Sequence, residues 1–123
     1  MSIASHSLVA STQLKNCLVI TVGDDLGGDT LDEIRRLALD GIVQTNCQFV
    51  ILELTMLKYI DGNEFESLVN LSKVALILGA KTIFVGLPVG IVLHLMSINI
   101  NTQGIQAAVD LNSAFLLIGR TEV

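Results

Sequence analysis

Three short runs of mainly β-branched and other apolar residues recur along the chain, at positions 17–22, 49–54 and 81–85, and each contains at most one charged residue. Each run is followed by a loop and then by a stretch whose apolar residues recur at helical spacing. Strands that are apolar on both faces are typical of parallel sheets, because helices cover both sides of such sheets. The alternation therefore predicts an α/β fold built on a mostly parallel sheet.

The same pattern continues toward both ends of the chain. We expect a four- to five-stranded, mostly parallel sheet with about four helices, in which a further strand covers 8–14 and a short last strand covers 104–109. The helices are expected near 30–42, 63–78, 88–99 and 111–118. Residues typical of helix ends flank these segments: Asp29 or Thr30, Asn63, Pro88 and Asp110 at the starts, and Gly79 at one end.

Length and charge limit what such a chain can do. The 123 residues suit a single domain, 1–123, of which 1–12 form either a flexible segment or an edge strand. The formal net charge of −5 argues against a nucleic-acid interface and against docking on anionic lipid. Charged residues make up only 15%, against about 25% in an average soluble domain, so we expect part of the apolar surface to be shared with other chains.

We expect neither a targeting segment nor a membrane-spanning segment in this sequence. Its first residues lack the basic start and apolar core of a signal peptide. Residues 83–100 carry no acidic or basic residue apart from His94, but Gly86, Pro88 and Gly90 interrupt them. Cys17 and Cys47 stand alone without metal-ligand spacing, which predicts buried free thiols in a cytoplasmic protein.

No set of residues points to catalysis, a cofactor or a metal ion. The two histidines, His6 and His94, have no recognisable nucleophile or ligand partners. The loop at 23–28 follows a strand as a phosphate-binding loop would, but its glycines do not have the required spacing and its aspartates would repel phosphate. We therefore expect a solvated acidic loop and a protein that is not an enzyme.

The segment 50–63 is the most distinctive part of the sequence. An apolar strand ends near Leu54, a short loop follows, and Ile60 precedes Asp61 just before a predicted helix. Loops at the carboxyl ends of parallel strands are where ligands and partners dock. Asp61 is equally well explained as a helix cap, and a cap is compatible with partner binding.

Four short motifs occur here in a characteristic order: Glu53-Leu54-Thr55, Ile60-Asp61-Gly62, Gly79-Ala80-Lys81 and Val85-Gly86-Leu87-Pro88. From about Asn16 to Leu117 the chain resembles the STAS domain, the fold of bacterial anti-sigma-factor antagonists. The resemblance is strongest to the stressosome branch, which includes the scaffold RsbS and the carboxyl-terminal domains of RsbR proteins.

The resemblance implies a non-enzymatic scaffold that co-assembles with RsbR-like paralogues and holds a serine/threonine kinase of the RsbT type. It implies a homo- or hetero-oligomer whose partners are proteins. In the family the kinase phosphorylates a Ser or Thr directly after the motif aspartate, and the added charge releases it. The residues expected at the partner-binding site are Thr55, Lys58, Tyr59, Asp61, Gly62, Asn63 and Glu64.

The chain departs from that pattern at Gly62, which has no hydroxyl to phosphorylate. Thr30 occupies a second phospho-acceptor position of the RsbR-type domains, although a plain helix cap explains it as well. Ser67 is a weaker, off-register candidate. The chain is then either a scaffold controlled at another residue or a constitutive binder. Two other functions stay open: a free antagonist of an anti-sigma kinase, and a STAS domain that senses a small ligand.

Overall fold

The computed structural model describes residues 9–88, 90–91 and 105–122. Within them, five strands form one sheet in the order β1-β2-β3-β4-β5. The elements follow one another as β1 (Val9–Leu14), β2 (Cys17–Val22), α1 (Thr30–Thr45), β3 (Phe49–Glu53), α2 (Gly62–Ile77), β4 (Lys81–Val85), β5 (Ile105–Ala108) and α4 (Leu111–Glu122).

The sheet is parallel except at one edge. β1 pairs antiparallel with β2, and the tight hairpin between them places Lys15 at a positive φ of 55°. β2, β3, β4 and β5 are parallel neighbours, with Cys17 opposite Phe49 and Phe49 opposite Lys81. The expected α/β class, the mostly parallel sheet and the additional strand near the amino terminus are therefore confirmed.

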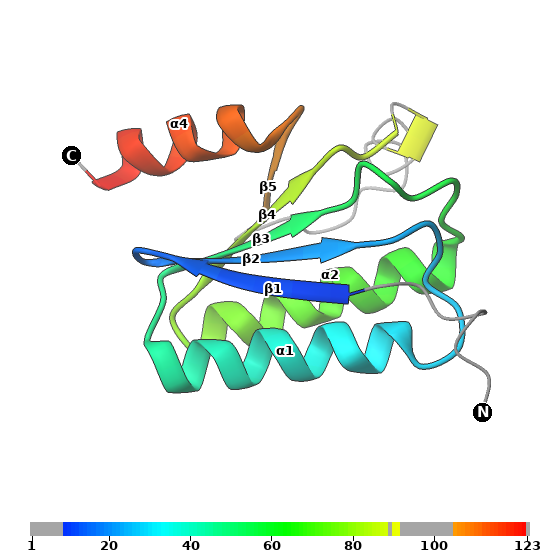
Figure 1. Ribbon diagram of the computed structural model, residues 1–123, viewed down its shortest axis with the longest axis horizontal. Helices are drawn as coiled ribbons and strands as arrows, with labels where there is room; N and C mark the ends of the chain where they lie inside the picture. The colour runs from blue at the N-terminus through cyan, green and yellow to red at the C-terminus, as the bar shows by residue number, and fades with distance from the viewer. Residues whose placement is uncertain (1–8, 89, 92–104, 123) are drawn as a thin grey trace.

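Helices α1 and α2 cover one face of the sheet (Figure 1). Alternate residues of the strands point to this face, among them Ile20, Leu52 and Phe84, all fully buried. The ring of Phe65 on α2 packs edge-on against Phe84, with ring centroids 5.8 Å apart. Burial of these apolar side chains fixes the helices on the sheet and so fixes the loops that precede them.

The opposite face has less cover, because among the described elements only α4 packs on it (Figure 1). Ala114 and Ile118 of α4 lie against side chains of β2, β3 and β4. A cavity of about 630 Å³ remains between this helix and the β1–β2 hairpin. It is lined by Leu14, Lys15, Asn16, Cys17, Phe115, Ile118 and Gly119.

The helices differ from the expectation in several respects. α1 continues to Thr45, beyond the expected end near 42. α2 begins at Gly62 with Asp61 as its cap, so the expectation that Asn63 caps this helix is wrong. α4 continues to Glu122, beyond the expected end at 118. The helix expected over 88–99 falls mostly outside the described residues, where only Gly90 and Ile91 are helical. The described part of the chain thus holds three helices instead of about four.

Cys17 and Cys47 are buried free thiols, as predicted. No helix in the described ranges is long and apolar enough to span a bilayer.

Candidate partner-binding site

The loop between β3 and α2 has a buried base. The Leu54 N–H donates to the Val85 carbonyl at 2.8 Å, which extends the β3–β4 pairing by one step beyond the strand. The Leu57 N–H then donates to the Leu54 carbonyl at 3.1 Å, and both leucine side chains are buried. Because the loop is anchored by backbone hydrogen bonds and apolar burial, its other residues are held in place.

Thr55 lies directly against Gly86, the residue that follows β4. A Cβ on Gly86 would come within 2.8 Å of the Thr55 Cα and 2.9 Å of its nitrogen, and Gly86 has a φ of +79°. Thr55 is also hydrogen-bonded to Glu53, whose carboxylate accepts from both the Thr55 N–H and its hydroxyl. Only glycine fits this position, since it tolerates positive φ and leaves room for the neighbouring backbone.

The outer part of the loop presents large side chains to solvent. Met56 is 64% exposed, Tyr59 is 67% exposed, and Lys58 is exposed between them. The Lys58 N–H donates to the Asp24 carbonyl at 3.2 Å, so this loop is joined to the loop that precedes α1. Tyr and Met are enriched at the centres of protein–protein interfaces, so this part of the loop suits contact with another protein.

Asp61 and Glu64 form a reciprocal cap at the start of α2. The Asp61 carboxylate accepts from the Glu64 N–H at 2.7 Å, and the Glu64 carboxylate accepts from the Asp61 N–H at 3.0 Å. This capping box satisfies two backbone donors that the helix would otherwise leave unpaired. The cap interpretation of Asp61 is therefore confirmed; Asp61 is exposed and Glu64 is partly exposed.

Gly62 occupies the first position of α2, and its surroundings are open. A Cβ there would meet no atom within 4 Å, and its φ does not lie in the left-handed region. Asn63 beside it is exposed, and its carbonyl accepts from the Ser67 hydroxyl at 3.1 Å. The geometry at position 62 would thus accept a serine or threonine, so neither space nor backbone conformation requires glycine there.

Thr30, the second phospho-acceptor candidate, is only 5% exposed. It is the first residue of α1, and its N–H donates to the Gly27 carbonyl at 3.2 Å. Asp29 is the cap residue, although its side chain makes no capping hydrogen bond. Thr30 is therefore not the cap, and a kinase could reach its hydroxyl only after the start of α1 opened.

Acidic residues gather where α1 and α2 begin, and we call this region the acidic end. It comprises Asp24, Asp25, Asp29, Asp32, Glu33, Asp61, Glu64 and Glu66. Carboxylates are stabilised there because helix amino-termini carry partial positive charge. Since these groups share one edge of the molecule, the acidic end favours a partner with a basic surface.

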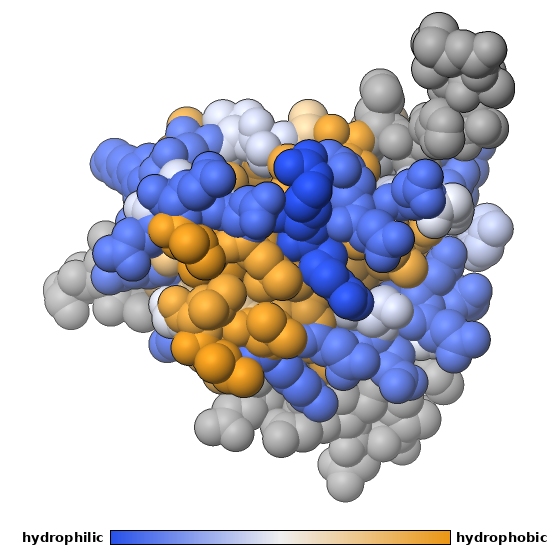
Figure 2. Space-filling view, turned by 90° about the horizontal axis from the view of Figure 1, so that it is seen from below, coloured by the Kyte–Doolittle hydropathy of each residue, from blue (hydrophilic) through white to orange (hydrophobic). Residues whose placement is uncertain are grey.

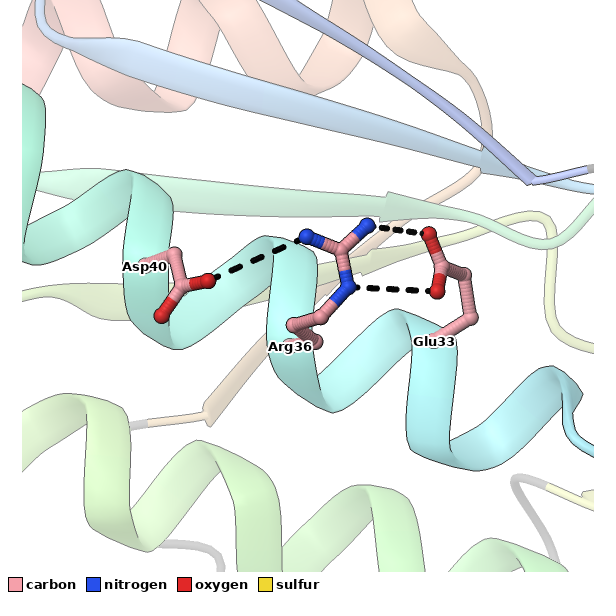
Figure 3. Close-up of polar contacts among 3 residues, drawn as sticks. All are labelled: Glu33, Arg36 and Asp40. Carbon is pink, nitrogen blue, oxygen red and sulfur yellow. Dashed lines mark hydrogen bonds and ion pairs between the residues drawn. The ribbon is translucent and has the colours of Figure 1, made fainter.

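Arg36 offsets part of this charge on α1 (Figure 3). Its guanidinium donates two hydrogen bonds to the Glu33 carboxylate, one of them from Nε at 3.2 Å, and lies 3.9 Å from an Asp40 oxygen. The hydrogen bond from Arg36 lowers the pKa of the Glu33 carboxyl below its usual value. The described residues contain no group of three or more side chains suited to hold a metal ion.

No protein-family model matches the chain, and no match is found among curated proteins. Solved structures do match. An RsbS variant from Moorella thermoacetica superposes with a TM-score of 0.78 at 15% identity, over 93% of this chain and 97% of that one. A chain of the structure that describes the molecular architecture of the stressosome superposes with a TM-score of 0.76 at 14% identity, over 92% of this chain and 98% of that one. The anti-sigma factor antagonist SpoIIAA in its unphosphorylated form superposes with a TM-score of 0.69 at 12% identity, over 94% of this chain and 98% of that one.

The chain has a STAS-like fold. The resemblance found in the sequence is thereby confirmed at the level of the fold. SpoIIAA is also known in a phosphorylated form, which matches with a TM-score of 0.67 at 12% identity.

On this STAS-like fold, the seven residues expected at the site, from Thr55 to Glu64, lie together in the β3–α2 loop and the first turn of α2. Thr30 is the first residue of the neighbouring helix α1 and is buried. The sequence reasoning missed Met56 as an exposed member of the loop. It also assigned no contact to Gly86, although a lone glycine directly after a buried strand signals a tight turn or a close backbone approach.

Proposed function

We propose that the chain is a non-enzymatic STAS regulatory scaffold of the stressosome type, which acts in a cytoplasmic sigma-factor pathway. It binds a serine/threonine kinase of the RsbT type through the β3–α2 loop and the start of α2, and it assembles with further STAS chains. The likeness to RsbS, to the stressosome chain and to SpoIIAA supports this proposal.

One observation is the main support for the docking site: the β3–α2 loop exposes large side chains, while buried side chains and backbone hydrogen bonds hold its base in place. Met56 and Tyr59 stand out into solvent while Leu54 and Leu57 are buried beneath them. An interface of this kind loses little conformational entropy on binding, because the loop backbone is already ordered. The neighbouring carboxylates of Asp61 and Glu64 supply the charge that selects a basic partner.

Gly62 bears on how binding is controlled. A scaffold without a hydroxyl after Asp61 cannot release its kinase by phosphorylation at that position. We propose that this chain holds its kinase constitutively through the β3–α2 loop. The open surroundings of Gly62 allow this to be tested by returning a serine to the position.

The docking site is tested by removing charge without removing the helix cap. Asp61→Asn keeps a side-chain oxygen to accept from the Glu64 N–H but loses the negative charge. We expect it to weaken capture of a purified RsbT-type kinase at unchanged protein stability. Asp110→Asn is the matched control, since Asp110 accepts from the Ser113 N–H at 2.8 Å at the start of another helix, α4. Equal kinase capture by both variants and the wild type would reject the site.

The cavity beside α4 favours a second candidate function, the binding of a small apolar ligand. Its volume of about 630 Å³ is within the range of ligand sites, and its lining is mainly apolar with Lys15 among the polar residues. It lies between the β1–β2 hairpin and α4. A thermal-shift screen with fatty acids tests this function: the absence of any increase in melting temperature rejects it.

A further inference from the structure

The chain's exposed aliphatic residues include a group at the ends of α1 and α2. Ile77 is 83% exposed and Val43 is 70% exposed, and Val74 and Leu78 are partly exposed nearby on α2 and its cap. We call these four residues the helix-end patch. Figure 2 shows a broad apolar area on the face that carries α1 and α2. We propose that this patch binds a second copy of the chain.

The inference rests on the proposed function, because a scaffold must contact further copies of itself. The inference identifies the surface that makes this contact. The patch suits contact between apolar surfaces. Exposed apolar patches of a few hundred Å² mark interaction sites on soluble proteins. A stable interface removes about 800 Å² from each partner and is apolar mainly at its centre. Four large aliphatic side chains supply such a centre, with the polar surface around them as its rim.

The distribution of charge favours a copy of the same chain. With a net charge of −5, two copies repel each other wherever their carboxylates come close. The acidic end lies at the opposite end of α1 and α2, and the 16 residues of α2 separate the two regions by about 24 Å. This exceeds the Debye length of about 8 Å at physiological ionic strength, so copies can meet at the patch with little repulsion.

The border of the patch carries both signs of charge. Lys73 lies one turn before Ile77 on α2 and makes no ion pair within the described part of the chain. Asp40 lies one turn before Val43 on α1, and Arg36 is 3.9 Å from it (Figure 3). In a two-fold interface the same surface meets itself, so a border with both signs can be self-complementary. A border of a single sign would repel its own copy.

The experiment measures the association of the full chain by sedimentation velocity and light scattering over a range of concentrations. Ile77→Asp and Val43→Asp each place a charge in the patch, and we expect association to weaken about tenfold or more. Val109→Asp is the control, because Val109 is equally exposed at 83% but lies in the turn between β5 and α4. We expect this control to associate as the wild type does.

Three results would overturn the inference: a wild type that stays monomeric at every concentration, patch variants that associate normally, or a Val109→Asp variant that dissociates as much as they do. The first result would favour a free antagonist. Circular dichroism checks that each variant is folded. If Ile77→Asp does not fold, Ile77→Asn takes its place and is judged by the same criterion.

Kinase capture separates this inference from the proposed function. Ile77→Asp should still capture the kinase, and Asp61→Asn should still associate, because the two sites lie at opposite ends of α2. Normal association without capture by the wild type would reject the proposed docking function and leave the patch assignment intact. Capture by a monomeric wild type would reject the patch and leave kinase docking intact.

Discussion

Replacing Gly86 with alanine should test the close contact that positions the β3–α2 loop. The new methyl group would lie 2.8 Å from the Thr55 Cα and 2.9 Å from its nitrogen, distances that side-chain carbons essentially never adopt. Both atoms belong to backbone, so no rotation of a side chain can relieve the contact. The backbone of Thr55 or of Gly86 must therefore shift.

The size of the effect follows from two separable costs. A residue other than glycine at φ +79° costs about 1–2 kcal/mol. Forcing an extra carbon into a filled site adds about 1–3 kcal/mol. We therefore expect Gly86→Ala to lower the free energy of unfolding by about 2–5 kcal/mol, and to weaken kinase capture because Thr55 is displaced.

Two further glycines provide matched controls. Gly79, which ends α2, has a φ of +97°, and a Cβ there would meet no atom within 4 Å, so Gly79→Ala incurs the backbone cost of about 1–2 kcal/mol alone. Gly62 has neither positive φ nor a close neighbour, and Gly62→Ala should raise stability by about 0.4–1 kcal/mol.

Urea denaturation of the three variants measures these differences at unchanged m-value. The expected order of stability is Gly62→Ala, wild type, Gly79→Ala and then Gly86→Ala. If Gly86→Ala loses no more stability than Gly79→Ala, the contact with Thr55 does not constrain the loop, and our account of its rigidity is wrong.

Three other predictions concern the helix starts. Asp61→Ala removes the α2 cap and should lower the free energy of unfolding by about 1 kcal/mol, whereas Asp61→Asn should change it little in the same denaturation experiment. Gly62→Ser should become a substrate of an RsbT-type kinase, detected as one added phosphate by intact mass, and the phosphorylated form should release the kinase. Hydrogen bonds from the Ser113 N–H and hydroxyl lower the pKa of Asp110 below its ordinary value of 3.8. The Asp110 carboxylate therefore stabilises the fold above pH 3.8, and this contribution is lost as the pH falls through the lower pKa of the folded state. Asp110→Asn should lack this acid-dependent contribution when unfolding is measured over a range of pH.

The strands and the first two helices were predictable because their signals are local. Cys17–Val22 and Lys81–Val85 are apolar runs bounded by turn residues, and their observed bounds agree with the expected ones. Gly79 ended α2 as expected, because its left-handed backbone completes a helix-ending motif in which the Ala80 N–H donates to the Ala75 carbonyl.

The boundaries of helices were harder, since several residues compete for each cap. Both Asp61 and Asn63 are good caps by residue type, and the reciprocal bond with Glu64 decided for Asp61. The sequence could have shown this, because an acidic cap followed three residues later by Glu is a known start signal. The burial of Thr30 could not have been predicted, because it depends on how α1 packs against the sheet.

The site was predictable as a segment but not as a surface. The order of Leu54, Asp61 and Gly62 along the chain located the loop, whereas the exposure of Met56 and the contact between Thr55 and Gly86 arise from packing between distant strands. The helix-end patch escaped detection for a similar reason. Ile77 lies off the buried stripe that Leu68, Leu71 and Ala75 form on α2, and only the three-dimensional structure shows that α1 and α2 end at the same side of the molecule (Figure 1).

The hydrogen bond from Lys58 to Asp24 means that the two loops beside the acidic end cannot move independently. We expect that opening the start of α1, the step that would make Thr30 accessible, also shifts the preceding loop, which holds the Asp24 carbonyl. The Lys58 N–H then loses its acceptor, and the loop with Tyr59 loses one of its anchors. We therefore expect a shift of one loop to reach the other through this main-chain hydrogen bond, even in a protein whose position 62 has no hydroxyl of its own.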